Sequence, residues 1–303
     1  MKKINKLILS LMVLFLLLVL NTTVVNASST KISAPKNVKV SVSGVTNAKV
    51  KWSKVSGAKK YTIYRATSKK GKYKKVGTSK TNSFVNKDLA RGKTYFYKVV
   101  ANGANSKSKK SSYAKVKILT KGQVLKKIRN ALKDKKWVKN NVKIKDVNGR
   151  VLDSKQVLYF GKLKNKELVA VEAVSETGYS IQMFIVGYKI GKIVSSPSSN
   201  PLHPFHGGPA IDLNTGMAFA FSLNRGYTFL QISKVSGVKF KILDTFRDDE
   251  GAMSDKATFE LNGKKISKKK YTSASRKYNK YNFISLSYNG YKLTNSNIDK
   301  YIK

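Results

Sequence analysis

Between residues 33 and 121, hydrophobic and polar residues alternate in seven short segments. In the first segment Val38, Val40 and Val42 share one face of an extended chain, and turn pairs such as Asn102-Gly103 separate the segments. Period-2 patterns of this length, without a helical stretch between them, are typical of a β-sandwich. We therefore expect strands around residues 38–42, 48–52, 61–63, 73–76, 84, 95–101 and 114–118.

Individual residues in this region carry a more specific resemblance. Trp52 ends the second predicted strand, and Leu89 lies six positions before Tyr95, where the longest strand begins. With Pro35 leading into the first strand, the region resembles a fibronectin type III domain, an all-β, immunoglobulin-like sandwich, over about residues 33–121. The resemblance implies that Trp52 and Leu89 are core residues and that Tyr95 forms a corner that fastens its strand to a nearby loop. The expected core contains Trp52, Tyr61, Leu89, Tyr95 and Val99.

The pattern changes after this region, and residues 122–303 read as a second domain. Apolar positions in residues 123–134 recur at helical spacing, which predicts an amphipathic helix. Apolar segments separated by hairpin-type turns follow, beginning with a predicted strand at residues 142–144. We therefore expect an α+β domain, mainly antiparallel, with two or three helices.

Three local signals shape the last part of this domain. The pair Asn262-Gly263 predicts a tight hairpin. Ser267 is a candidate N-cap for a short helix that reaches to about Tyr281. The alternation of apolar residues at positions 284–288 predicts a further strand.

This second domain resembles C-terminal modules of secreted Gram-positive proteins that have no assigned chemistry. The shared features are the succession of hairpins, the run at residues 262–267 and the run at residues 278–281. Such modules often carry an acidic repeat, whereas residues 161–167 are basic here, so no calcium role carries over. The resemblance implies no activity.

The N-terminus has the pattern of an export signal. Lys2, Lys3 and Lys6 precede an apolar run at residues 7–20, and small residues lead to Ala27. This tripartite pattern predicts a secretory signal peptide at residues 1–27, cleaved after about Ala27. The alternative is an uncleaved membrane anchor, but a spanning helix needs about 20 apolar residues. We expect an extracellular protein, secreted or associated with the cell wall.

Charge is the strongest functional signal of the sequence. The chain has 61 Lys and Arg residues against 15 Asp and Glu residues, which gives a net charge of +46. Residues 28–121 contain 25 basic residues and a single acid, Asp88. A field of this size attracts anionic polymers and weakens as salt rises. The alternative is a compositional bias toward Lys that serves no more than solubility.

These observations favour a non-catalytic binding or adhesion protein at the cell surface. The expected partner is anionic cell-wall polymer or another extracellular polyanion, with carbohydrate as a further candidate. Nucleic acid is also open, because phosphate contacts with Lys need no sequence motif. The candidate binding residues form one local cluster: Lys69, Lys70, Lys72, Lys74 and Lys75.

Catalytic chemistry has few candidate residues in this chain. The absence of Cys excludes disulfides, zinc–thiolate sites and Cys nucleophiles, and the chain has two His residues. His203 and His206 could bind a metal with Asp212 as third ligand, but the prolines and glycines around them indicate a loop. We expect no metal, cofactor or catalytic residue here.

An acidic cluster is the second candidate for chemistry. It comprises Asp248, Asp249, Glu250 and Asp255, and its spacing does not match the calcium loop of an EF-hand. A carboxylate pair for glycoside hydrolysis is also possible, which keeps open an extracellular hydrolase acting on wall or glycan, with its site in residues 122–303. The favoured interpretation of the cluster is a solvated loop with local ion pairs.

Overall fold

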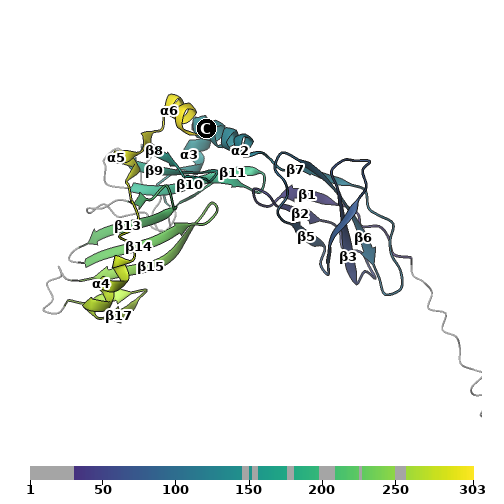
Figure 1. Ribbon diagram of the computed structural model, residues 1–303, viewed down its shortest axis with the longest axis horizontal. Helices are drawn as coiled ribbons and strands as arrows, with labels where there is room; N and C mark the ends of the chain where they lie inside the picture. Colours follow the sequence, from purple (N-terminus) through teal and green to yellow (C-terminus); the bar gives the residue numbers. More distant parts are fainter. Residues whose placement is uncertain are drawn as a thin grey trace, which may run out of the picture.

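The computed structural model describes residues 31–144, 150–151, 156–175, 181–197, 209–224, 227–249 and 257–303. The predicted signal peptide at residues 1–27 lies outside these ranges. The described chain folds as a β-sandwich followed by a mixed part with two sheets and several short helices (Figure 1). All strand pairs are antiparallel, so the fold class expected from the sequence is confirmed.

Seven strands form the sandwich, in two sheets. The three-stranded sheet has the order β1-β2-β5, and the four-stranded sheet has the order β4-β3-β6-β7. The strands are β1 (Lys39–Val42), β2 (Ala48–Lys51), β3 (Lys60–Ala66), β4 (Lys74–Ser79), β5 (Ser83–Asn86), β6 (Thr94–Asn102) and β7 (Ala114–Lys117).

The sandwich core lies between these two sheets. All five residues expected there, Trp52, Tyr61, Leu89, Tyr95 and Val99, are buried. The rings of Trp52 and Tyr61 meet edge to face at 5.1 Å. The Tyr95 hydroxyl accepts a hydrogen bond of 2.9 Å from the backbone N–H of Ala90. This bond ties β6 to the segment that precedes it, as the resemblance to the fibronectin family implied.

Two sheets and a layer of helices form the second part of the chain. The five-stranded sheet has the order β11-β10-β9-β8-β18, and the six-stranded sheet runs from β12 to β17 in sequence order. The first sheet comprises β8 (Gln156–Lys162), β9 (Leu168–Ser175), β10 (Ile181–Lys189), β11 (Lys192–Pro197) and β18 (Tyr291–Lys292). The second comprises β12 (Ala210–Ile211), β13 (Met217–Asn224), β14 (Tyr227–Val235), β15 (Phe240–Asp248), β16 (Phe259–Leu261) and β17 (Lys264–Ile266).

Helices cover one face of the five-stranded sheet, and the six-stranded sheet lies toward its other face (Figure 1). The covering helices are α2 (Lys121–Lys133), α3 (Lys135–Asn141) and α6 (Asn295–Tyr301). Ile128 of α2 belongs to the same core cluster as Val171, whereas Met183 and Ala218 join the two sheets on the other side. Helix α4 (Lys268–Arg276) packs on the far face of the second sheet, where the Tyr271 ring meets Phe246.

The amphipathic helix expected at residues 123–134 is present as α2, and Thr120 caps it. The Thr120 side chain accepts from the Gln123 backbone N–H, and the Gln123 side chain accepts from the Thr120 backbone N–H. This reciprocal capping box starts the helix directly after the sandwich. An ion pair also connects the sandwich with the second part of the chain. Arg91 of the sandwich pairs with Glu167 of the β8–β9 turn, at 3.0 Å.

Several expectations for the second part are wrong. Residues 142–144 form no strand. Helix α3 runs to Asn141, the backbone N–H of its C-cap Val142 donates to the Val138 carbonyl, and residues 143–144 follow without regular structure. Residues 284–288 form no strand either, since α5 (Leu286–Asn289) begins there.

The number and lengths of the helices also differ from the expectation. Ser267 does cap a helix, but α4 ends at Arg276 and does not reach Tyr281. The described ranges contain five helices after the sandwich, not two or three. Three of them have seven residues or fewer, and segments this short show too few turns for helical periodicity to be read.

Candidate polyanion-binding face of the sandwich

The outer surface of the four-stranded sheet follows from the alternation of side chains along β6. Tyr95, Tyr97 and Val99 point into the core and are buried, so the side chains of Phe96 and Lys98 stand on the opposite face. Both of these residues are partly exposed. The sheet therefore presents an aromatic ring and a lysine to solvent on its central strand.

Lysines from separate segments lie over aromatic rings on this face. Lys98 Nζ lies 4.8 Å from the centroid of the Tyr73 ring, and Lys110 Nζ lies 4.8 Å from that of Tyr64. Lys69 Nζ lies 5.4 Å from the centroid of Tyr113, whose ring also packs at 5.6 Å against Phe96. We call this set the lysine–tyrosine face: Tyr64, Lys69, Tyr73, Phe96, Lys98, Lys110 and Tyr113.

The register of the sheet brings these residues together. Tyr64 of β3 lies opposite Lys98 of β6 on one side and opposite Lys75 of β4 on the other. An ammonium above a ring is held by the ring quadrupole, with about 0.5–1 kcal/mol at exposed sites. Each ammonium has three N–H groups, so a ring on one side leaves it donors for other partners. The arrangement thus holds cationic donors beside flat apolar surfaces.

The predicted lysine cluster lies at the edge of this face. All five predicted residues, Lys69, Lys70, Lys72, Lys74 and Lys75, are exposed on the turn from β3 to β4 or on β4 itself. Lys69 contacts a ring, and Lys75 pairs with Tyr64 in the strand register. Among the described residues, no ring contact is found for the remaining three lysines.

Sequence reasoning missed the residues that come from other strands. Lys98 and Phe96 could have been found, because they occupy the outward positions of a strand that was correctly predicted. Lys110 and Tyr113 lie before β7 in a segment without regular pattern, and no sequence signal placed them near Tyr64.

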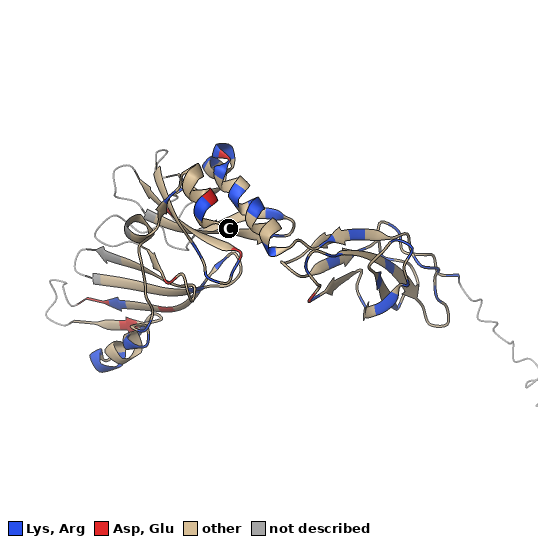
Figure 2. Ribbon diagram, turned by 45° about the horizontal axis from the view of Figure 1, so that its top comes forward, with Lys and Arg blue, Asp and Glu red and all other residues tan. Residues whose placement is uncertain are grey.

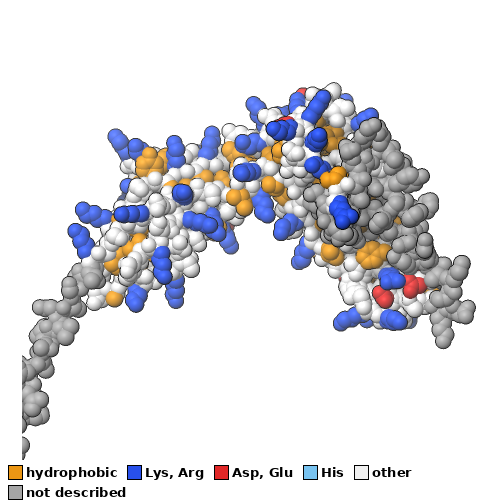
Figure 3. All heavy atoms as spheres, turned by 180° about the vertical axis from the view of Figure 1, so that it is seen from behind, with side chains coloured by type: hydrophobic (Ala, Val, Ile, Leu, Met, Phe, Trp, Pro, Cys, Tyr) orange, Lys and Arg blue, Asp and Glu red, His pale blue; other side chains and the backbone are white. Residues whose placement is uncertain are grey.

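Acidic residues are scarce around this face. The single acid of the sandwich, Asp88, lies after β5 of the other sheet, and its backbone N–H donates to Asn47 in the β1–β2 turn. Figure 2 shows blue basic positions on many strands of the sandwich. In Figure 3 the visible face of the sandwich carries projecting basic side chains, while the red acidic ones lie on the second part of the chain. The positive field of this domain is therefore not offset locally.

The candidates for metal or catalytic chemistry do not assemble in the described ranges. His203, His206, Glu250 and Asp255 lie outside those ranges. Asp212 is buried, and its Oδ1 accepts from the backbone N–H groups of Asn214 and Thr215, which makes it the cap of a turn. Within the described part of the chain, no group of three or more His, Asp or Glu side chains could hold a metal ion.

The acids at the end of β15 also serve local structure. Asp248 accepts a hydrogen bond of 2.7 Å from the Tyr271 hydroxyl, and Asp249 accepts one from the Thr258 hydroxyl. Asp249 further pairs with Arg247 at 3.4 Å. These contacts connect neighbouring strands with α4. Because Glu250 and Asp255 lie outside the described residues, the interpretation of the whole cluster as a solvated loop stays a prediction.

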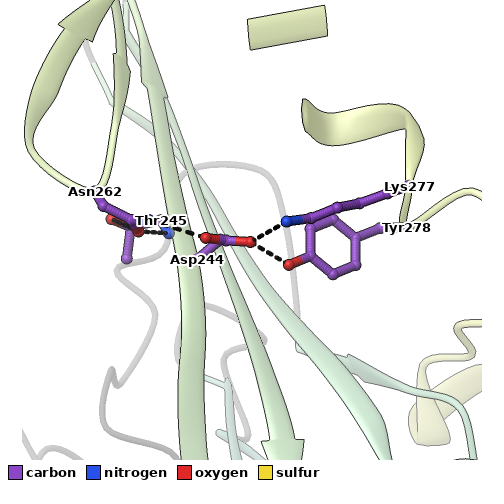
Figure 4. A network of polar contacts seen from close by, with 5 residues as sticks. All are labelled: Asp244, Thr245, Asn262, Lys277 and Tyr278. Carbon is purple, nitrogen blue, oxygen red and sulfur yellow. Dashed lines mark hydrogen bonds and ion pairs between the residues drawn. The ribbon is translucent and has the colours of Figure 1, made fainter. Parts of the chain in front are cut away.

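A network around Asp244 fastens β15 to two later segments (Figure 4). Asp244 Oδ2 accepts from Lys277 Nζ at 2.7 Å and from the Tyr278 hydroxyl, and Oδ1 accepts from the Asn262 amide at 2.9 Å. Asn262 in turn accepts from the Thr245 backbone N–H at 2.8 Å. Burial would raise the pKa of Asp244, but the hydrogen bonds from Lys277, Tyr278 and Asn262 outweigh it and lower that pKa.

Glu172 is a fully buried acid that sequence reasoning did not single out. It lies on β9, and its carboxylate accepts from the Ser287 backbone N–H at 2.9 Å and from the hydroxyls of Ser285 and Ser287. Burial raises the pKa of Glu172, and the hydrogen bonds from these serines offset only part of the effect. Its contacts hold the start of α5 against the sheet, which is a structural role.

Comparisons with known proteins found partial structural likenesses at low sequence identity. No protein-family model and no curated protein matches this sequence. A fibronectin type III-like protein from Clostridium thermocellum shares 23% identity over 28% of this chain and 90% of its own, with a TM-score of 0.27. A human fibronectin type III domain shares 21% identity over 30% of this chain and 74% of its own, with a TM-score of 0.26. A β-1,2-glucanase from Parabacteroides distasonis shares 22% identity over 34% of this chain and 15% of its own, with a TM-score of 0.28.

These likenesses span 28% and 30% of this chain. They carry no substrate or partner to it. Across the described ranges, no helix combines the length and the apolar character needed to cross a membrane.

Proposed function

We propose that this protein is a non-catalytic extracellular binding protein, and that the lysine–tyrosine face of its sandwich binds an anionic cell-wall polymer. The observation that carries the proposal is the placement of Lys69, Lys98 and Lys110 over aromatic rings on one sheet surface. The predicted signal peptide at residues 1–27 would bring this face to the cell surface.

The chemistry of the face suits a polymer that alternates phosphate and sugar or polyol units. The ammonium groups would take the phosphates, and exposed rings such as Tyr113 would pack against the apolar side of a sugar. Binding of phosphates by lysines releases counterions from the polymer, so the affinity should fall steeply with salt. Because Lys is a flexible point donor without the planar fork of Arg, selectivity among polyanions should be low.

The proposal is tested by retention of the purified protein, residues 28–303, on cell walls. Walls are prepared with their anionic polymers intact and after chemical removal of those polymers. Binding is followed as salt rises from about 0.05 M to about 0.5 M, which shortens the Debye length severalfold. We expect retention on intact walls at low salt, and its loss on stripped walls and at high salt. Retention that ignores both changes would contradict the proposal.

A further inference from the structure

A cavity of about 670 Å³ lies in the second part of the chain, beside the helices that cover the five-stranded sheet. Its walls come from the C-terminal end of α2, from α3, from the start of β8 and from residues 292–298. This volume is within the usual range of about 300–1,000 Å³ for small-molecule sites. The cavity is separate from the lysine–tyrosine face, because it shares no residue with it.

The apolar part of the wall is aliphatic. Leu132, Val138, Leu158, Leu293 and Ile298 line the cavity, and none of the lining residues described is aromatic. A sugar would be expected to pack on aromatic rings, whereas a wall of branched aliphatic side chains suits an alkyl chain. Val151, which is 48% exposed, adds apolar surface that water still reaches.

The polar part of the wall is cationic. Lys133, Lys135, Lys139, Lys143 and Lys292 line the cavity, and none of the described lining residues is an acid. Lys133 is paired with Asp299 at 2.5 Å, but among the described residues the other four lysines have no carboxylate partner. Charge complementarity therefore calls for an anionic group on the occupant.

We propose that this cavity binds a single-chain anionic amphiphile: an alkyl chain lies against the aliphatic wall, and a carboxylate or phosphate headgroup meets the four lysines that have no carboxylate partner among the described residues. Tight binding requires both the alkyl chain and the anionic headgroup. An alcohol of the same length would lose the lysine contacts, and a quaternary ammonium would be repelled by them. A short anion would lose the aliphatic wall.

The proposal is tested on the purified chain, residues 28–303, by isothermal titration calorimetry, with each ionic probe below its micelle concentration and dodecanol below its solubility limit. The probes are dodecanoate, dodecyl phosphate, dodecanol and dodecyltrimethylammonium, with decanoate for chain length. We expect saturable one-to-one binding of both anions, at least tenfold weaker binding of dodecanol and no binding of the cation. Two methylene groups fewer should weaken binding about tenfold, if each buried group contributes its usual amount.

Matched variants locate the site. Lys135→Glu, Lys139→Glu and Lys292→Glu together should weaken dodecanoate binding at least tenfold, whereas Lys121→Glu, Lys126→Glu and Lys127→Glu on the exposed side of α2 should not. Val151→Asp should weaken it severalfold, and Ile242→Asp, at a similarly exposed position outside the cavity, should not.

Equal affinity for dodecanoate and dodecanol, absence of saturable binding, or equal losses in the two triple variants would overturn the proposal. Because the probe series uses the unmodified chain, it decides the matter even if a variant fails to fold. Substitutions on the lysine–tyrosine face should leave dodecanoate binding unchanged, so this result and that of the proposed function are independent.

Discussion

Lys98 on β6 holds its Nζ 4.8 Å above the ring of Tyr73, which precedes β4 on the far side of β3. The contact spans β3, on which Tyr64 lies directly opposite Lys98. A lysine and a tyrosine from distant points in the sequence thus meet because of the strand order. The pairing of strands in the sheet therefore determines which lysines and rings meet on this surface.

The rings should matter for polymers that contain sugar and much less for polymers that do not. Tyr113, which is 38% exposed, offers a ring whose removal leaves the core intact. Tyr113→Ser should weaken binding to a sugar-phosphate polymer about fivefold, if the ring contributes about 1 kcal/mol. Binding to inorganic polyphosphate should change less than twofold. Equal losses for both polymers, measured by titration at one salt concentration, would show that the ring does not contact sugar.

Asp244 should make the stability of the protein depend on acid pH. Its folded-state pKa is lowered, so its contribution is present above the unfolded pKa and is lost as pH falls through the folded pKa. Melting between pH 7 and pH 2 should therefore show a loss of stability in acid that is smaller in Asp244→Asn. Asp88→Asn, at an exposed carboxylate of the sandwich, is the control and should keep the loss. A wild-type pH profile in Asp244→Asn would contradict this role.

Glu172 should make the protein less stable as pH rises, the opposite of the effect of Asp244. Burial raises its folded-state pKa, so the stability it contributes is complete below the unfolded pKa and is lost as pH rises through the folded pKa. Glu172→Gln removes the ionisation and keeps one acceptor oxygen for the Ser287 backbone N–H, while its amide NH2 group can donate to the hydroxyls of Ser285 and Ser287. We expect this variant to gain stability relative to the wild type as pH rises above the unfolded pKa of Glu, in chemical denaturation at several pH values. If Glu172→Gln loses stability relative to the wild type as pH rises, this role of Glu172 is wrong.

The β10–β11 hairpin carries a correctable strain. Ile190 has φ of 49° and precedes Gly191 with φ of 81°, a pair of left-handed residues as in a type I′ turn. A β-branched residue is unfavourable in that region, whereas Asn tolerates it. Ile190→Asn should raise the free energy of unfolding by about 1 kcal/mol. Ile242→Asn, a strand position of comparable exposure, should not stabilise the protein, and a destabilised Ile190→Asn would refute the turn assignment.

How far the sequence predicts this molecule depends on how local each feature is. The sandwich strands were predicted because each has its own alternating pattern, and Trp52 and Tyr95 mark the ends of two of them. The prediction of a strand at residues 284–288 is wrong because the conformation of this segment depends on the contact of Ser287 with Glu172, a residue far away in the sequence. A short alternating run does not report such a contact.

In the candidate site, too, the features that depend on local sequence could be predicted and those that depend on distant contacts could not. Lys69 and the lysines that follow it in the turn are close together in the sequence, so the sequence itself shows this cluster. Lys98 and Lys110 join them through strand pairing and through an irregular segment, and the rings beneath them have the same origin. The sequence therefore predicts where positive charge is dense, but the pairing of each lysine with a ring becomes visible in three dimensions.

The most direct test of the account compares two triple variants with the same net charge. Lys69→Gln, Lys98→Gln and Lys110→Gln remove the lysines that lie over rings, and Lys39→Gln, Lys51→Gln and Lys87→Gln remove three from the other sheet and its following loop. Their affinities for purified anionic wall polymer are measured at one ionic strength. We expect at least a tenfold loss of affinity for the first variant and less than a threefold loss for the second. Equal losses would mean that the total charge acts without a defined face and would contradict the account.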